Sequence, residues 1–144
     1  MTVKNESFII STHGFDDVID ITQKIKEFVS FSGAKEGVVN VFIASSSSGI
    51  ILTEQEPGIT EDIKKLLSFM IPVNKVYEHD ALWHEGNGFA YIRSAFFPKN
   101  ISLPVIDGVL GIEKYQSILL LDFDNKASVK KITLSLVYNQ DKNS

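Results

Sequence analysis

The chain has 144 residues, 44% of them hydrophobic and 22% charged, which is typical of a single globular domain. It contains no cysteine, which excludes disulfides, thiolate metal sites and cysteine nucleophiles and fits a reducing cytoplasm. The formal net charge of -4 argues against a nucleic-acid partner, because nucleic-acid surfaces are basic. No stretch resembles a signal peptide or a membrane span, so we expect a cytoplasmic protein with no membrane partner.

The first third of the chain predicts a strand followed by a helix. Residues Ser7–Ser11 are predicted to form the strand. Asp20 is suited to cap the helix, and Gln23 follows it at the spacing of a capping box. Gly33 is placed to end the helix. Apolar residues at helical spacing form one face, which we expect to be buried: Ile21, Ile25, Phe28 and Val29.

Two strands and a second helix are predicted next. The strands, Val38–Ala44 and Ile50–Thr53, flank a run of serines. Pro57–Gly58 is expected to break the second strand. Thr60 is then predicted to cap a helix that Pro72 ends.

The rest of the chain predicts a long loop and then a series of strands. The loop, residues 73–88, is polar, and long ordered loops often carry function. Asp107 and Gly108 form a strong signal for a two-residue hairpin. Helices early and strands late predict an α+β fold: one domain over residues 1–144, with a large, mainly antiparallel or mixed β-sheet and two main helices. The late strands are Phe89–Phe97, Ser102–Ile106, Val109–Ile112, Tyr115–Phe123 and Val129–Tyr138.

Two features near the predicted strand ends offer groups for binding or catalysis. The turn Ser45–Ser48, followed by Gly49, could present hydroxyl and amide donors to an anion such as phosphate. It could equally satisfy its own backbone. Glu54, at the end of the following strand, could act as a general base or could simply be solvated. Neither feature alone decides between these alternatives.

The long loop carries five polar side chains that could act as acid–base groups or metal ligands: His79, Asp80, His84, Glu85 and Asn87. Their spacing matches no standard zinc pattern, and no third histidine lies near them, so we predict no metal site and no cofactor. Arg93 follows the loop and could clamp a carboxylate or phosphate, or could neutralise an acid such as Glu54.

Four segments occur in a fixed order: DITQKIKEFVSFSGAKEG (20–37), VFIASSSSGIILTEQEP (41–57), HDALWHEGNGFAYIRSA (79–95) and LPVIDGVLGIEKYQSILLLDFD (103–124). The second is similar to a strand, an H-T-T-A-G turn and an I-N-E-N-x-D-P segment. The third contains a stretch similar to G-N-A-H-A-H-(L/I)-K-A-S. In order and spacing, over about residues 7–138, the chain resembles the YjbQ-like family, often labelled secondary thiamine-phosphate synthase.

The resemblance implies a compact α+β domain that assembles as a homotrimer, with a histidine-containing cleft near the subunit contacts. The activity attributed to the family is weak thiamine-phosphate synthesis. That reaction joins a pyrimidine methyl diphosphate to a thiazole phosphate and releases pyrophosphate.

Ser45, Phe89 and Tyr91 stand where the family usually carries its cleft histidines. An altered cleft of this kind favours stacking of a ring over binding of a metal, because phenylalanine has no donor atom. Glu54 and His79 match family positions and are the predicted catalytic residues. The predicted ligand-binding residues are Ser45, Ser46, Ser47, Asn87, Tyr91, Arg93 and Gln116.

The resemblance therefore implies a YjbQ-like protein with weak or lost thiamine-phosphate synthase activity and a cleft for a small phosphorylated or aromatic ligand. The alternative is a non-catalytic homotrimeric binding or assembly protein. The replaced histidines leave open whether the chain is an enzyme.

Overall fold

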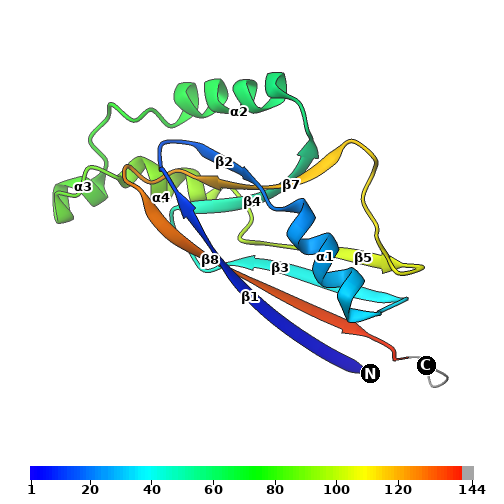
Figure 1. Cartoon of the computed structure of the whole chain (residues 1–144). Coiled ribbons are helices and arrows are strands. Elements are labelled where there is room, and N and C mark those ends of the chain that lie inside the picture. The colour runs from blue at the N-terminus through cyan, green and yellow to red at the C-terminus, as the bar shows by residue number, and fades with distance from the viewer. Residues whose placement is uncertain (141–144) are drawn as a thin grey trace.

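The computed structural model describes residues 1–140, which form two antiparallel sheets and four helices (Figure 1). Five strands are ordered β1-β8-β3-β5-β6, and three are ordered β2-β7-β4. The α+β fold predicted from the sequence is confirmed, with α1 and α2 as its two main helices. The bounds are β1 Thr2–Thr12, β2 Asp17–Asp20, α1 Thr22–Ser32, β3 Gly37–Ile43, β4 Ser48–Glu54, α2 Pro57–Met70, α3 Glu78–Trp83, α4 Gly88–Ala95, β5 Asn100–Ile106, β6 Val109–Leu110, β7 Gln116–Asp122 and β8 Ser128–Tyr138.

The main core lies where α1 and the three-stranded sheet meet the inner face of the five-stranded sheet (Figure 1). The predicted apolar face of α1 is buried there. Alternate residues of β8, Ile132, Leu134 and Leu136, point into the same core and are at most 1% exposed. Each such side chain contributes about 2 kcal/mol to folding by leaving water.

A second apolar cluster lies on the other face of the three-stranded sheet. It contains Leu67 and Ile71 from α2 and its end, Phe89 from α4, and Leu121 and Phe123 from and just after β7. Because β7 is covered on both faces, every residue from 117 to 122 is buried. This explains why β7 appears in the sequence as a continuous apolar run rather than an alternating one.

The strand predicted at Phe89–Phe97 is wrong, because these residues form the helix α4. Phe89, Ala90, Arg93 and Ser94 are buried, a spacing that gives one face of a helix. Ser94 also donates a hydrogen bond from Oγ to the carbonyl of Ser48 on β4 at 2.7 Å. Packing of this face overrides the strand preference of its aromatic and β-branched residues.

Two helix starts also differ from the prediction. The helix α2 begins at Pro57 instead of after Thr60, since proline at the first helical position loses no hydrogen bond. Asp20 does accept a hydrogen bond from the backbone N–H of Thr22 at 2.9 Å, but Gln23 donates to Glu27 and completes no capping box. The predicted long loop contains the short helix α3.

Two predicted turns are confirmed. Gly33 ends α1 with a φ of 73°, which glycine adopts without strain. Asp107 and Gly108, with φ of 51° and 78°, turn the chain between β5 and β6. Across residues 1–140, no helix is both long and apolar enough to cross a membrane.

Candidate functional site

A series of hydrogen bonds and one ion pair, which we call the polar chain, connects the serine turn to the α3 region. It runs through Ser47, Lys130, Asp122, Asp124, Asn87 and His79. Lys130 donates from Nζ to Ser47 Oγ at 3.2 Å, and the same nitrogen lies 3.8 Å from Asp122 Oδ1. Asp122 is completely buried and also accepts a hydrogen bond from Thr12 Oγ1.

The second half of the polar chain leads to the surface. The backbone N–H of Asp124 donates to Asp122 Oδ1 at 3.1 Å. Asn87, which is 4% exposed, donates from Nδ2 to Asp124 Oδ1 at 3.4 Å. His79 Nε2 lies 3.1 Å from Asn87 Oδ1 and 3.2 Å from Glu85 Oε2. The polar chain therefore starts in the interior and ends at a histidine whose side chain is 29% exposed.

Strand pairing brings these residues together. Residue 122 ends β7, and the short turn after it leads into β8, so Asp122, Asp124 and Lys130 lie close in sequence and in space. The β4–β7 register places Ser48 opposite Asp122, and the backbone N–H of Phe123 donates to the carbonyl of Ser47 at 2.9 Å. The serine turn is thereby fixed against the end of β7.

His79 is held in one tautomer by its acceptors. Asn87 uses its Nδ2 to reach Asp124, which leaves Oδ1 to accept a hydrogen bond. The carboxylate of Glu85 is also an acceptor, so Nε2 of His79 must carry the hydrogen. In the neutral ring Nδ1 then has a free lone pair that can accept a proton. The ring of Tyr91 lies beside the imidazole, with 4.7 Å between centroids and a tilt of 50°.

The structure places Glu54 and Gln116 at the opposite end of the three-stranded sheet. The two residues face each other across β4 and β7. They lie six positions along β4 from the Ser48–Asp122 pair, or about 20 Å at roughly 3.3 Å per residue. Glu54 is exposed, and Gln116 accepts a hydrogen bond from the backbone of Glu113. One chain therefore does not bring together the predicted catalytic pair, Glu54 and His79.

Arg93 is 1% exposed, and its donors are taken by the protein itself. Nε and Nη2 donate to the carbonyl of Ile71 at 3.1 and 2.9 Å, and Nη1 donates to Asp16 Oδ1 at 2.7 Å. The guanidinium also lies 5.3 Å from the ring centroid of Phe89. This arginine fastens α4 to the end of α2, and a ligand could reach it only if these bonds were released.

The serine turn is largely satisfied by itself. The backbone N–H of Ser47 donates to Ser45 Oγ at 3.2 Å, and Ser48 Oγ donates to the same oxygen. Ser46 is exposed and Ser45 is half-buried, so these two can meet a ligand. Of the three positions predicted to replace cleft histidines, Phe89 is buried in the second apolar cluster, while Ser45 and Tyr91 reach the surface.

Sequence reasoning missed Asp122, Asp124 and Lys130 as parts of a site. One signal was present: Lys130 shares the alternating positions of Ile132 and Leu134, which point into the core. A lysine on the buried face of a strand needs a partner. Among residues 1–140, no group of three or more histidine, aspartate or glutamate side chains is arranged to hold a metal ion.

Residues 6–139 match the family described as UPF0047 protein YjbQ-like. A UPF0047 protein of Methanothermobacter thermautotrophicus is 29% identical over 124 residues, which cover 86% of this chain and 85% of that protein. The UPF0047 protein YugU of Bacillus subtilis is 26% identical over 117 residues, which cover 80% of this chain and 86% of that protein.

Solved structures show the same fold. A YbjQ-like protein of unknown function from Sulfolobus solfataricus superposes with a TM-score of 0.89 at 26% identity, covering 96% of this chain and 99% of that one. A yjbq/upf0047 family protein from Clostridium acetobutylicum gives a TM-score of 0.83 at 27% identity, covering 92% and 99%. With the match over residues 6–139, the chain belongs to the YjbQ-like UPF0047 family.

Proposed function

We propose that this chain is a cytoplasmic protein that binds a small aromatic or phosphorylated ligand beside His79, with weak or lost thiamine-phosphate synthase activity. The observation that carries the proposal is the oriented imidazole at the exposed end of the polar chain. Its Nδ1 lone pair can accept a proton, and Tyr91 offers a ring face next to it.

The charges around His79 favour binding of the aromatic ring of such a ligand rather than of its phosphate. The charge close to His79 is negative, because Glu85 Oε2 lies 3.2 Å from its Nε2 and the carboxylate of the adjacent Asp80 also interacts with the imidazole. This negative charge attracts a ring with amino donors and repels a phosphate. A phosphate would need donors from elsewhere, such as the exposed hydroxyl of Ser46 or a neighbouring subunit of a homotrimer.

The test compares His79→Asn with His84→Asn in purified, metal-supplemented protein. His84 is exposed at the end of the same helix and has a φ of 58°, which asparagine tolerates. We expect a pyrimidine methyl diphosphate and a thiazole phosphate to give a small amount of thiamine phosphate by mass spectrometry, above a heat-killed control. The product should be lost in His79→Asn and kept in His84→Asn.

Binding without turnover has its own signature. In that case no product forms, but an aminopyrimidine ligand at about 100 times its Kd should stabilise the fold by about 2.7 kcal/mol. The stabilisation should disappear in His79→Asn and in Tyr91→Ala. If neither product nor ligand-dependent stabilisation is found with folded protein, the site beside His79 has no such function.

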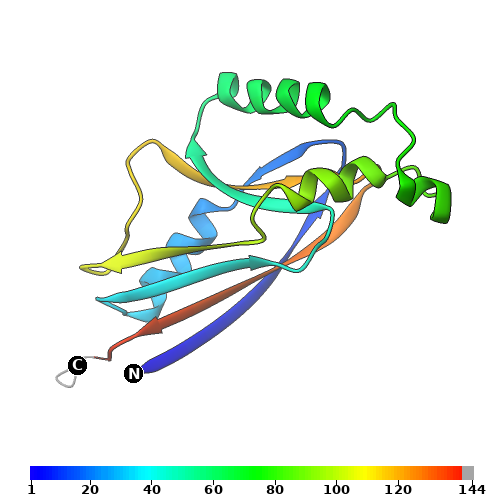
Figure 2. The same cartoon turned by 180° about the vertical axis from the view of Figure 1, so that it is seen from behind.

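A homotrimeric assembly role is the second candidate, favoured by the outer face of the five-stranded sheet. Four of its exposed apolar residues are Val38, Phe42, Ile106 and Val137, which are 39–53% exposed. Within the described residues no helix lies over this face (Figure 2). An apolar face of this kind is typical of a surface that another subunit covers.

Light scattering coupled to size exclusion tests the assembly proposal. A homotrimer of 16.0 kDa chains should show three times the monomer mass. Phe42→Lys should reduce the mass to that of one chain, because burying a lysine on this face is costly. A monomeric mass for the unaltered protein would contradict the proposal.

A further inference from the structure

A groove lies between the first turns of α2 and the strands β2 and β7, at the end of the three-stranded sheet away from His79. It has two adjoining lobes that share Asp20 and Gln55. One lobe has a volume of about 460 Å³ and the other about 260 Å³. Sites for small molecules have volumes of about 300 to 1,000 Å³, so the groove is large enough for one.

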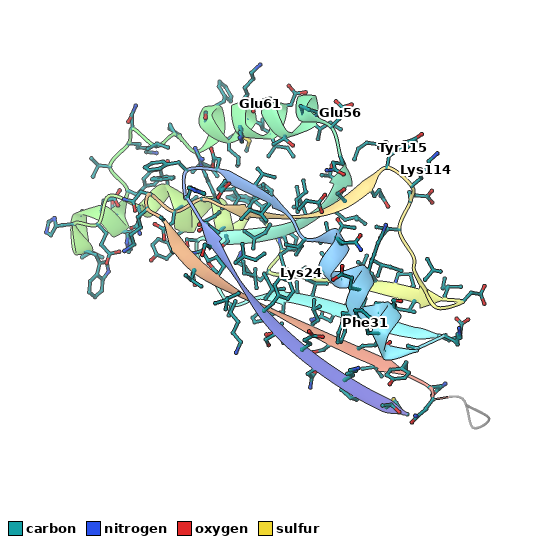
Figure 3. The ribbon with its side chains drawn as sticks, viewed as in Figure 1. Lys24, Phe31, Glu56, Glu61, Lys114 and Tyr115 are labelled. Carbon is teal, nitrogen blue, oxygen red and sulfur yellow. The ribbon has the colours of Figure 1, made fainter. Side chains whose placement is uncertain are left out.

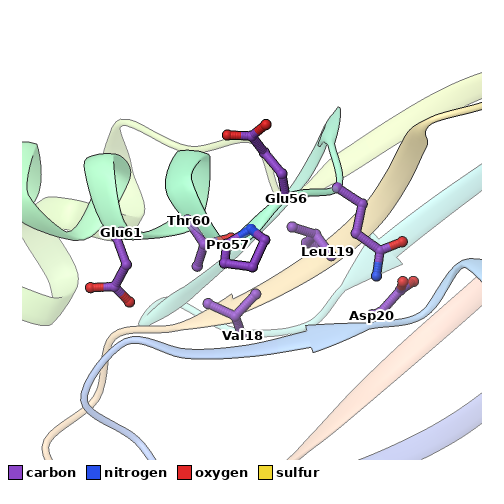
Figure 4. A pocket seen from close by; sticks show the side chains of 8 residues that line it. Val18, Asp20, Glu56, Pro57, Thr60, Glu61 and Leu119 are labelled. Carbon is purple, nitrogen blue, oxygen red and sulfur yellow. The ribbon is translucent and has the colours of Figure 1, made fainter.

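The larger lobe, which we call the acidic lobe, combines an apolar floor with carboxylates. Val18, Pro57 and Leu119 lie between the carboxylates of Asp20 and Glu61 (Figure 4). Glu61 is 3.7 Å from Lys64, and both side chains are exposed, so this pair is weak. Glu56 also lines this lobe, so the acidic lobe can cover the apolar face of a ring while offering three carboxylates to a cation.

The smaller lobe, which we call the basic lobe, has the opposite character. Lys26 and Lys114 line it together with the hydroxyl residues Thr22 and Ser117. Its one carboxylate is that of Asp20, which both lobes share and which already accepts a hydrogen bond from the backbone of Thr22. Lys114 belongs to the segment before β7, whereas Glu61 belongs to α2, so the two charges come from separate elements of the fold (Figure 3). Two ammonium groups and nearby hydroxyl donors are suited to a phosphate.

Gln55 connects the two lobes, and one hydrogen bond orients its side chain. Ser117 donates from Oγ to Gln55 Oε1 at 2.7 Å, which leaves the amide hydrogens of Gln55 available as donors in a residue that lines both lobes. An amide held in this way can donate to a ligand that spans both lobes.

We propose that this groove binds a small amphoteric molecule, with a ring and a protonated amine in the acidic lobe and a phosphate in the basic lobe. The site is separate from the one beside His79 and does not rest on it. The separation of charge along the groove sets the orientation, because each end of the ligand would be repelled from the wrong lobe.

Isothermal titration calorimetry with three related probes tests the proposal. Pyridoxamine 5′-phosphate has the ring, the amine and the phosphate. Pyridoxine 5′-phosphate has a hydroxyl in place of the amine, and pyridoxamine lacks the phosphate. We expect saturable binding of pyridoxamine 5′-phosphate and about tenfold weaker binding of each partial probe, which is typical for loss of one charge-assisted contact.

Two matched pairs of variants locate the binding site. Lys114→Gln should weaken pyridoxamine 5′-phosphate several-fold and leave pyridoxamine unaffected. Glu61→Gln should weaken pyridoxamine 5′-phosphate and leave pyridoxine 5′-phosphate unaffected. Lys131→Gln and Glu78→Gln, which remove exposed charges elsewhere, should change neither.

Three results would overturn the proposal: no saturable binding of pyridoxamine 5′-phosphate, equal affinity for all three probes, or equal losses in the variants and their controls. His79→Asn separates the two sites. If that variant binds pyridoxamine 5′-phosphate normally, the proposal for the groove is supported whatever the outcome of the activity assay. If it abolishes the binding, the probe occupies the site beside His79 and not the groove.

Discussion

The charged side chains at the two ends of the three-stranded sheet differ in burial and in their partners. At the Ser48 end, Asp122 and Lys130 are 0% and 8% exposed, and each has partners within the protein. At the Glu54 end, the carboxylates and lysines that line the groove are exposed. One end of the sheet therefore carries a buried network whose charges are paired, and the other end carries charges that are exposed to solvent.

This contrast separates charges that hold the fold from charges that are free to bind. Removing one member of a buried ion pair costs about 3 to 5 kcal/mol, because the remaining charge is left without a partner. Removing one member of an exposed pair costs about 0 to 1 kcal/mol. Stability measurements can thus show which end is structural before any ligand is known.

The largest expected effect is that of Lys130→Met. The substitution keeps much of the side-chain volume but leaves Asp122 buried with only its hydrogen bonds from Thr12 and Asp124. We expect the free energy of unfolding in urea to fall by about 3 kcal/mol, at the low end for a broken buried pair because those bonds remain.

Lys131→Met and Lys114→Met are the controls. Lys131 is the next residue on β8 and points to the outer face, and Lys114 lines the groove. Each should change stability by less than about 0.5 kcal/mol, as exposed substitutions usually do. Equal losses at Lys130 and Lys114 would remove the distinction between the two ends.

Arg93→Lys should give a smaller loss, of about 2 kcal/mol in the same unfolding measurement. Lysine keeps the charge but cannot place two donors on the carbonyl of Ile71 while reaching Asp16. Asp16→Asn, which removes only the ion pair, should cost less than Arg93→Lys. Unchanged stability in Arg93→Lys would show that these hydrogen bonds contribute little to the stability of the fold.

Much of the fold could be predicted because its signals are local. The Asp107–Gly108 hairpin, the end of α1 at Gly33 and the alternation along β8 each depend on a few neighbouring residues. The helix α4 could not be predicted from such local signals. Its aromatic and branched residues favour a strand, whereas its contacts with distant segments, including the second apolar cluster and Ser48 on β4, favour a helix.

The candidate site was harder to predict, since it depends on distances between segments. Sequence similarity grouped Glu54 with His79, but strand register places them at opposite ends of the sheet. Sequence similarity also predicted that Arg93 binds a ligand, whereas in the structure its guanidinium donates hydrogen bonds to Ile71 and Asp16. Asn87 and Tyr91 do lie beside His79, because all three belong to the α3–α4 region.

The smallest expected effect concerns pH and the support of His79. A hydrogen bond from the backbone N–H of Gly88, and then one from Tyr77, hold the pKa of Asp80 below its ordinary value of 3.8. A carboxylate with a lowered pKa in the folded state stabilises that state fully above about pH 3.8. The stabilisation is lost as pH falls through the folded-state pKa.

Asp80→Asn should therefore be less stable than the unaltered protein at pH 7, and the difference should shrink below pH 3.8. Urea unfolding of both proteins between pH 7 and pH 2.5 measures this, with Asp62→Asn as the control for loss of an exposed charge. Hydrogen exchange should also quicken in α3, because Asp80 ties the start of that helix to the start of α4. A difference that stays constant with pH would mean that Asp80 acts through its shape alone. His79 would then owe its position to Asn87 and Glu85.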